Sequence, residues 1–178
     1  MVKWMVGVIV LVVVGVGLWA FQPWRLFTSS EVDEDRPSSR VVDTATADPT
    51  DTASTQPTEQ PPAGDTTLST GEFEDAEHET SGQVEILRLA DGRRFVRFED
   101  LASSDGPDLH VWLSDRKSGG DWNSYDDGRY VKLGKLKATH GNQNYEIPES
   151  ADLDGLKSVV IWCDRFNVAF GTAPVTLG

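Results

Sequence analysis

The chain has few of the residues that usually carry redox or metal chemistry. Its 178 residues include one cysteine, Cys163, with two methionines and three histidines. A single cysteine excludes an intramolecular disulfide, and the absence of a C-x-x-C-H sequence excludes covalent attachment of a c-type haem. No histidine follows Cys163, and Met1 and Met5 lie far upstream, so the usual order of blue-copper ligands is missing. Structural zinc normally uses more than one thiolate.

Basic residues are also scarce, because 16 Lys and Arg stand against 29 Asp and Glu, which gives a formal net charge of −13. An acidic protein repels the phosphate backbone of nucleic acids, so the composition predicts no nucleic-acid partner. The sequence contains no evident Ser/His/Asp arrangement, glycine-rich phosphate-binding loop or separated pair of catalytic carboxylates. A hydrolase or a nucleotide-dependent enzyme is therefore disfavoured.

One long hydrophobic run is present, at the N-terminus. Residues 4–21 contain no charged side chain and, as a helix, would reach roughly 27 Å, which nearly spans a bilayer core. Trp4 lies at one end of the run, and Trp19 and Trp24 lie near the other, as in the aromatic belts of spanning helices. We interpret residues 1–26 as a single-pass transmembrane signal-anchor in the cell membrane, with the C-terminal domain outside the cytoplasm. A cleaved signal peptide is the alternative, although the exit sequence lacks a small-x-small cleavage site.

The middle of the chain differs sharply in composition from the two ends. Residues 27–69 are rich in Thr, Ser, Pro, Asp and Glu, and contain no aromatic residue after Phe27. Such a segment buries too little apolar surface to offset the entropy of ordering the chain. The composition therefore predicts a disordered linker, followed by a folded domain of ordinary size over residues 70–178.

Within residues 70–178 the hydrophobic pattern has a period of two, interrupted by short turn signals rich in Gly, Asn, Asp and Ser. This pattern predicts strands at residues 71–76, 83–89, 93–100, 108–114, 129–134, 144–148, 158–163, 165–171 and 174–177. About eight short strands in this length predict an all-β fold, either a β-sandwich or a small barrel. The acidic run 121–128 is expected to form Asx-turns, because its spacing is not that of an EF-hand.

The strand 158–163 is apolar on both faces and is therefore expected to be central or covered. In the strand 108–114, His110, Trp112 and Ser114 share one face, and Leu109, Val111 and Leu113 share the other. The short step at 164–165 predicts a tight turn or bulge. Such a turn would place the Cys163 thiol at the rim of a sheet.

Several ordered motifs carry a resemblance to a known family. They are SG at 81–82, GPDLHVWLS at 106–114, YVKLGKLKA at 130–138, GNQNYEIP at 141–148 and SVVIWCDRFNVAFGTAPV at 158–175. Together they resemble the DM-thirteen electron-transfer domain, which is found with DOMON domains in Skeletor-type animal proteins and also in anchored bacterial envelope proteins. The resemblance covers residues 70–177. His110 departs from the family pattern, in which an aromatic residue such as Tyr is common, and LKA stands in place of the usual LKG.

The resemblance implies a β-rich domain whose characteristic cysteine, matching Cys163, acts in redox chemistry. The sulfur would act either as a bare thiol or as the ligand of a prosthetic group such as haem. Cys163 is thus the first candidate redox residue, and His78 and His110 are further candidates for holding a cofactor. Two of these residues have a plainer interpretation. Cys163 can be read as an inert core cysteine, and His78 as a residue that forms hydrogen bonds at the surface. His140 is expected to lie in a turn.

We therefore predict a membrane-anchored, extracytoplasmic domain with a redox or electron-transfer role centred on Cys163. Its partners would be the membrane, through residues 4–21, and a redox or envelope protein of unknown identity. The alternative is a non-redox ligand- or protein-binding module, displayed on a stalk, whose recognition faces carry His110, Trp112 and Trp162.

Overall fold

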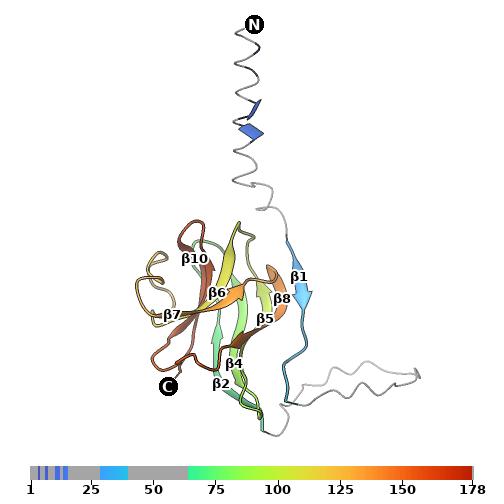
Figure 1. The fold of residues 1–178 in the computed structure, drawn as a ribbon, viewed down its shortest axis with the longest axis vertical. Helices are drawn as coiled ribbons and strands as arrows, with labels where there is room; N and C mark the ends of the chain where they lie inside the picture. The colour runs from blue at the N-terminus through green and yellow to red at the C-terminus, as the bar shows by residue number, and fades with distance from the viewer. Residues whose placement is uncertain are drawn as a thin grey trace, which may run out of the picture.

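The computed structural model describes residues 29–39 and 64–177, together with residues 4, 7, 11, 12, 14 and 15. In this part of the chain ten strands form two five-stranded sheets, which face each other as a β-sandwich (Figure 1). The predicted all-β fold is confirmed, and the sandwich is the correct one of the two predicted architectures. The expected number of about eight strands is wrong, since ten are present; among them, β1 (Glu31–Asp33) lies in the segment that was assigned to the linker, and the predicted strand at 71–76 is divided between β2 (Thr66–Glu72) and β3 (Glu74–Asp75).

The first sheet has the strand order β1-β8-β5-β4-β2. Its strands are β1 (Glu31–Asp33), β8 (His140–Ile147), β5 (Arg94–Ala102), β4 (Ser81–Arg88) and β2 (Thr66–Glu72). The strands are antiparallel except for β1, which pairs in parallel with β8. Sequence had placed a turn at 140–143, but these residues begin β8.

The second sheet has the order β3-β10-β9-β6-β7, and all of its pairs are antiparallel. Its strands are β3 (Glu74–Asp75), β10 (Val168–Pro174), β9 (Ser158–Cys163), β6 (Leu109–Ser114) and β7 (Tyr130–Lys135). Every residue of β9 is buried, and the strand lies at the centre of the sheet, as its two-sided apolar pattern predicts.

The main core fills the space between the two sheets. The alternation of each strand directs every second apolar side chain inward, and these side chains form one cluster. Fully buried members from both sheets are Val84, Ile86, Val96, Phe98, Val111, Leu113, Val159 and Ile161. Burial of each such side chain contributes about 1.5–3 kcal/mol, so the sandwich does not depend on a disulfide.

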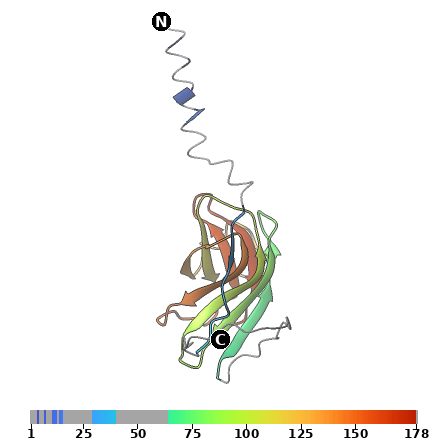
Figure 2. The same cartoon turned by 90° about the vertical axis from the view of Figure 1, so that its right-hand side faces the viewer.

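Residues 29–39, assigned by sequence to a disordered linker, instead pack against the first sheet. Strand β1 pairs with β8 at one edge (Figure 2), and the residues after it cross the sheet toward β2, where the Ser39 N–H donates to an Asp65 carboxylate oxygen at 3.2 Å. The backbone of β1 passes so close to Gly141 that a Cβ at this position would meet the carbonyl oxygen of Val32. Gly141 also has a φ of +93°, which glycine adopts readily. Beyond β1, Arg36 forms ion pairs with Glu85 and Glu99.

The folded domain also begins earlier than residue 70, since β2 starts at Thr66. The predicted membrane helix at residues 4–21 lies mostly outside the described residues. In the part of the chain that the structure describes, no helix has the length and apolar character needed to cross a membrane. The fold class is therefore corrected from a sandwich preceded by a transmembrane helix and a disordered stalk to a ten-stranded sandwich that includes part of the stalk.

The second sheet carries a further cover on the face that points away from the first sheet. Tyr125, from the segment between β6 and β7, lies buried in a cluster with Trp112 and Trp162. Its hydroxyl donates to the carbonyl oxygen of Lys117 at 3.1 Å, which closes this segment on itself. The backbone of the expected Asx-turn is present as well, since the Asn123 N–H donates to an Asp121 carboxylate oxygen at 3.4 Å.

Candidate functional site

Cys163 is the last residue of β9, and its side chain points into the core between the sheets. Its register partners are Leu109 in β6 and Val168 in β10. The predicted turn follows at once, because the Asn167 N–H donates to the Cys163 carbonyl oxygen at 2.9 Å, and Asn167 has a φ of 55°. The thiol does not lie on an open rim, however, since Cys163 is 0% exposed. The expectation of a reachable sulfur at the edge of the sheet is therefore corrected to a buried thiol.

Burial raises the pKa of the Cys163 thiol, because a thiolate loses its hydration there. Backbone hydrogen bonds from Phe166, Arg165 and Asp108 act on the sulfur in the opposite direction, and the negative charge of Asp108 adds to the rise. The net result is a higher pKa than that of a free cysteine. Cys163 is therefore a neutral thiol at neutral pH, and nucleophilic attack, which needs the thiolate, is disfavoured.

The surroundings of Cys163 do not fit a haem. Among the described residues, Cys163 lines neither the cavity of about 160 Å³ beside residues 105–109 nor the open hollow of about 460 Å³ beside Ser81 and His140. The sulfur is enclosed instead by aliphatic and aromatic core side chains. Haem ligation by Cys163 therefore has no support in this arrangement.

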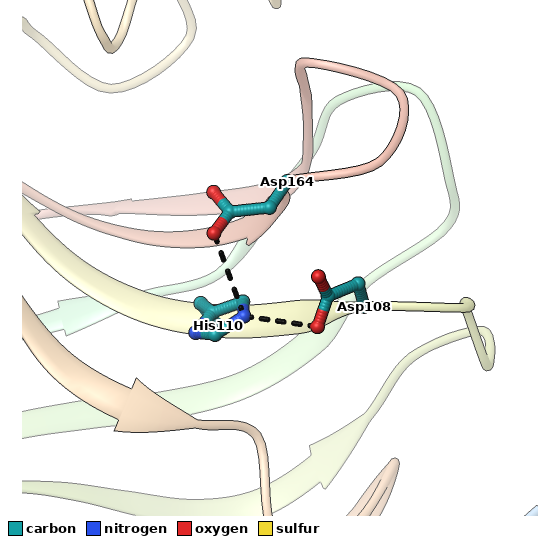
Figure 3. Close-up of side chains that lie close together, drawn as sticks. All are labelled: Asp108, His110 and Asp164. Carbon is teal, nitrogen blue, oxygen red and sulfur yellow. Dashed lines mark hydrogen bonds and ion pairs between the residues drawn. The ribbon is translucent and has the colours of Figure 1, made fainter.

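Asp108, His110 and Asp164 lie together on the opposite face of the same sheet (Figure 3). Asp108 and His110 are two residues apart at the start of β6 and so share a face, while Asp164 directly follows β9. His110 Nε2 lies 3.1 Å from Asp108 Oδ1 and 3.5 Å from Asp164 Oδ2. The Asp164 N–H donates to the Asp108 carbonyl oxygen at 3.0 Å, which fixes the two strand ends side by side.

Two ammonium groups from β7 complete this cluster. Lys132 Nζ lies 3.4 Å from Asp164 Oδ2, and Lys135 Nζ lies 3.2 Å from Asp108 Oδ1. Partial burial raises the pKa of Asp108, but hydrogen bonds from His110 and Lys135 outweigh that effect and lower it. The three side chains are chemically able to hold a cation, but the lysines already balance both carboxylates. We therefore describe the cluster as an ion-pair network that joins β6, β7 and β9.

The structure does not bring the candidate cofactor ligands together. Among the described residues, Asp108, His110 and Asp164 are the only group of three metal-capable side chains, and this group excludes Cys163 and His78. The His78 ring packs against Phe170, with ring centroids 4.0 Å apart. His140 lies in β8 rather than in a turn, and its Nδ1 lies 3.0 Å from the Thr139 hydroxyl oxygen.

Three aromatic rings are stacked beside the ion-pair network. The ring centroids of Trp162 and Trp112 are 4.7 Å apart, and those of Trp112 and Tyr130 are 4.4 Å apart. Trp162 and Trp112 are only 1% and 2% exposed, whereas Tyr130 is 36% exposed. The binding-module alternative required Trp112 and Trp162 to be displayed, and their burial removes that basis. Alternation placed Trp112 on the face opposite Leu109 and Trp162 on the face opposite Ile161, but it gave no signal for the cover of the indoles or for the Tyr130 stack.

Residues 72–175 match the family described as Electron transfer DM13. The chain belongs to this family. The match covers more than half of the chain and confirms the resemblance carried by the sequence motifs. No curated protein and no solved structure gives a significant match.

The DM13 region extends from the end of β2 to the residue after β10. It therefore contains Cys163, the ion-pair network and the aromatic stack, whereas β1 and residues 29–39 lie outside it. Membership of the family gives the domain an electron-transfer role. It does not say which side chain gives up or accepts the electron.

Proposed function

We propose that this DM13 domain transfers single electrons and that the sulfur of Cys163 is its redox-active group. The observation that carries the proposal is the setting of the thiol, which is fully buried at the end of the central strand while backbone hydrogen bonds are directed at it. A chain with one cysteine has no second thiol for an internal disulfide, so two-electron dithiol exchange within the domain is excluded. Burial also protects the sulfur from dissolved oxidants that convert accessible thiolates to sulfenic acid.

In the proposed reaction, the thiol gives one electron to a one-electron acceptor protein, and its S–H proton passes to solvent when the exposed turn at residues 164–167 admits water to the sulfur. The product is a thiyl radical, and the return of one electron and one proton restores the thiol. Because the raised pKa keeps the sulfur protonated at neutral pH, the electron and the proton leave together. No heavy-atom bond forms or breaks, so the rigid core need not rearrange.

The surface nearest to the sulfur is supplied by the turn at residues 164–167. All four of its residues are exposed, yet the backbone at Arg165 and Phe166 reaches the thiol through hydrogen bonds. Phe166 itself is 49% exposed. Electron tunnelling weakens steeply with distance, so this turn is the surface where we place a redox partner that exchanges electrons directly with Cys163.

The test is protein-film voltammetry on the full chain, comparing wild type with Cys163→Ala and Cys163→Ser. We expect a one-electron response in wild type and its loss in both variants while the circular dichroism spectrum is unchanged. Val168→Ala is the matched control, since Val168 is the cross-strand neighbour of Cys163 and its truncation perturbs the same core without removing sulfur. A response that persists unchanged in folded Cys163→Ala would contradict the proposal.

A further inference from the structure

We infer that Tyr130, Trp112 and Trp162 form a path along which single electrons move between the protein surface and the end of β9. The inference deepens the proposed function, because the path would connect the surface with Cys163, the residue that follows Trp162. It rests on the proposed function only in naming Cys163 as the end of the path. The stack itself can be tested in a chain that lacks the thiol.

The geometry of the stack suits transfer by successive short steps. The two contacts, with centroids 4.7 Å and 4.4 Å apart, have interplanar angles of 26° and 9°, so the rings overlap face to face. The series runs from two buried indoles to a half-exposed phenol. Tryptophan and tyrosine are, with cysteine, the side chains that lose one electron most readily. Transfer between rings in contact is much faster than one long tunnelling step through the aliphatic core.

The buried indole N–H of Trp112 supplies an independent observation. Its Nε1 has no hydrogen-bond partner among the described residues, although Trp112 is only 2% exposed. An unsatisfied buried donor is destabilising and needs an explanation in the structure. Without an acceptor, an oxidised Trp112 keeps its N–H proton. Return of the electron then needs no proton transfer. This suits a ring that passes electrons on more than a ring that holds a long-lived radical.

Lys132 places a positive charge over the same rings. Its Nζ lies 4.8 Å from the centroid of the Trp112 ring and 5.8 Å from that of Tyr130. This cation attracts the neutral ring face and repels a radical cation. It therefore makes Trp112 harder to oxidise, so that the positive charge passes through this ring without resting there.

Each step of the path conserves atoms and electrons. A one-electron oxidant at the surface takes an electron from Tyr130, which releases its phenolic proton to water. The Tyr130 radical then takes an electron from Trp112 and recovers a proton from water, and the Trp112 radical cation takes an electron from Trp162. No heavy-atom bond changes, and the oxidant is reduced by one electron.

The experiment uses the full chain with Cys163→Ser, so that its outcome is independent of the thiol. A ruthenium polypyridyl complex is attached to an introduced Asp127→Cys side chain, because Asp127 is exposed and lies three residues before Tyr130. A flash in the presence of a cobalt(III) quencher produces the ruthenium(III) oxidant. Transient absorption then records the indole radical, and exchange into deuterated water shows whether the radical retains its N–H proton.

We expect a protonated indole radical cation in the reference protein. Tyr130→Leu should abolish its fast formation, because it removes the ring at the surface end of the stack, and Trp162→Phe should remove the last transfer step. Trp122→Phe is the matched control, because Trp122 is 47% exposed but is not part of the stack, and this change should have no effect. An unchanged radical in folded Tyr130→Leu, or its loss in Trp122→Phe, would overturn the inference.

A second pair of variants tests the effect of the cation. Lys132→Gln should increase the yield of the Trp112 radical, because the repelling charge is removed. Lys135→Gln removes the same charge from the same strand, but Lys135 has no cation–π contact with either ring and should leave the yield unchanged. Equal effects of the two variants would contradict a direct role for Lys132. If the stack conducts in Cys163→Ser while wild type shows no thiol-dependent response, the path stands and the proposed role of Cys163 fails.

Discussion

The two faces of strand β9 pack into two different buried clusters. Toward the first sheet, β9 presents Val159, Ile161 and Cys163 to an aliphatic core. On the other face, it presents Val160 and Trp162 to an aromatic cluster covered by the segment between β6 and β7. The inner face is closed by a second sheet, whereas the outer face is closed by one connecting segment and a ring stack.

The two faces of β9 also differ in their access to solvent. The inner face excludes water and keeps the thiol neutral, which protects it but also isolates it. The ring stack on the outer face ends at the partly exposed Tyr130, beside an ion-pair network, so this face reaches the solvent. The proposed electron transfer through Cys163 would need both kinds of environment close together.

The largest effect is expected when one large ring is removed from each face of β9. Trp162→Ala and Phe170→Ala should each lower the free energy of unfolding by about 3–5 kcal/mol, because both side chains are almost fully buried. Urea unfolding of the two variants measures this directly. A loss below about 1 kcal/mol for Trp162→Ala alone would show that the outer face is a loose cover and not a second core.

The inner face should tolerate a polar atom poorly. Cys163→Ser nearly preserves volume but buries a hydroxyl, so we expect a loss of about 1–3 kcal/mol in the free energy of unfolding. Cys163→Ala, which loses the sulfur without adding a polar group, is the control. Equal or greater stability of the Ser variant would mean that the backbone around residues 164–167 satisfies the hydroxyl.

The pH dependence of stability offers a sharper test of the buried thiol. The folded pKa of Cys163 is raised above the reference value of 9.0, so the neutral form is favoured in the folded state. Its contribution is therefore complete below about pH 9 and is lost as the pH rises through the folded pKa. Wild type should lose stability above pH 9 relative to Cys163→Ala. Parallel curves for the two proteins would indicate a solvated sulfur.

A smaller effect is expected where the N-terminal segment joins the edge of the first sheet. Burial raises the pKa of Glu34, but hydrogen bonds from Lys137 and from the Asn144 backbone outweigh it and lower that pKa. Stability from this contact is present above the reference value of 4.5 and is lost as the pH falls through the folded pKa. Glu34→Gln should cost about 0.2–1 kcal/mol at neutral pH. Protease sensitivity of residues 29–39 would report the release of the segment, with Asp35→Asn as the control.

The smallest effect is expected from added metal. Because Lys132 and Lys135 already pair with the carboxylates beside His110, zinc or calcium should not raise the unfolding temperature. Calorimetry with and without the ions tests this. A rise in the unfolding temperature that disappears in Asp164→Asn would show that a metal ion displaces the lysines from the carboxylates.

Much of the site is explained by local pattern once the strands are known. Alternation placed His110 and Trp112 on the face opposite Leu109, and the two-sided apolar run placed β9 at a central position. The turn after Cys163 was also predictable. What local pattern did not reveal was that the sulfur is fully covered, since this depends on the backbone of Asp108 lying against it from another strand.

An all-β domain, the two faces of β6 and β9, and the resemblance to an electron-transfer family could be inferred from sequence alone. These features follow from short-range periodicity and from ordered motifs. Three others became visible only in the fold: the polar segment at β1 pairs with β8, Asp108, His110 and Asp164 meet, and three rings stack. Each of these results depends on strand register or on a covering segment, and contacts between residues far apart in the sequence decide both.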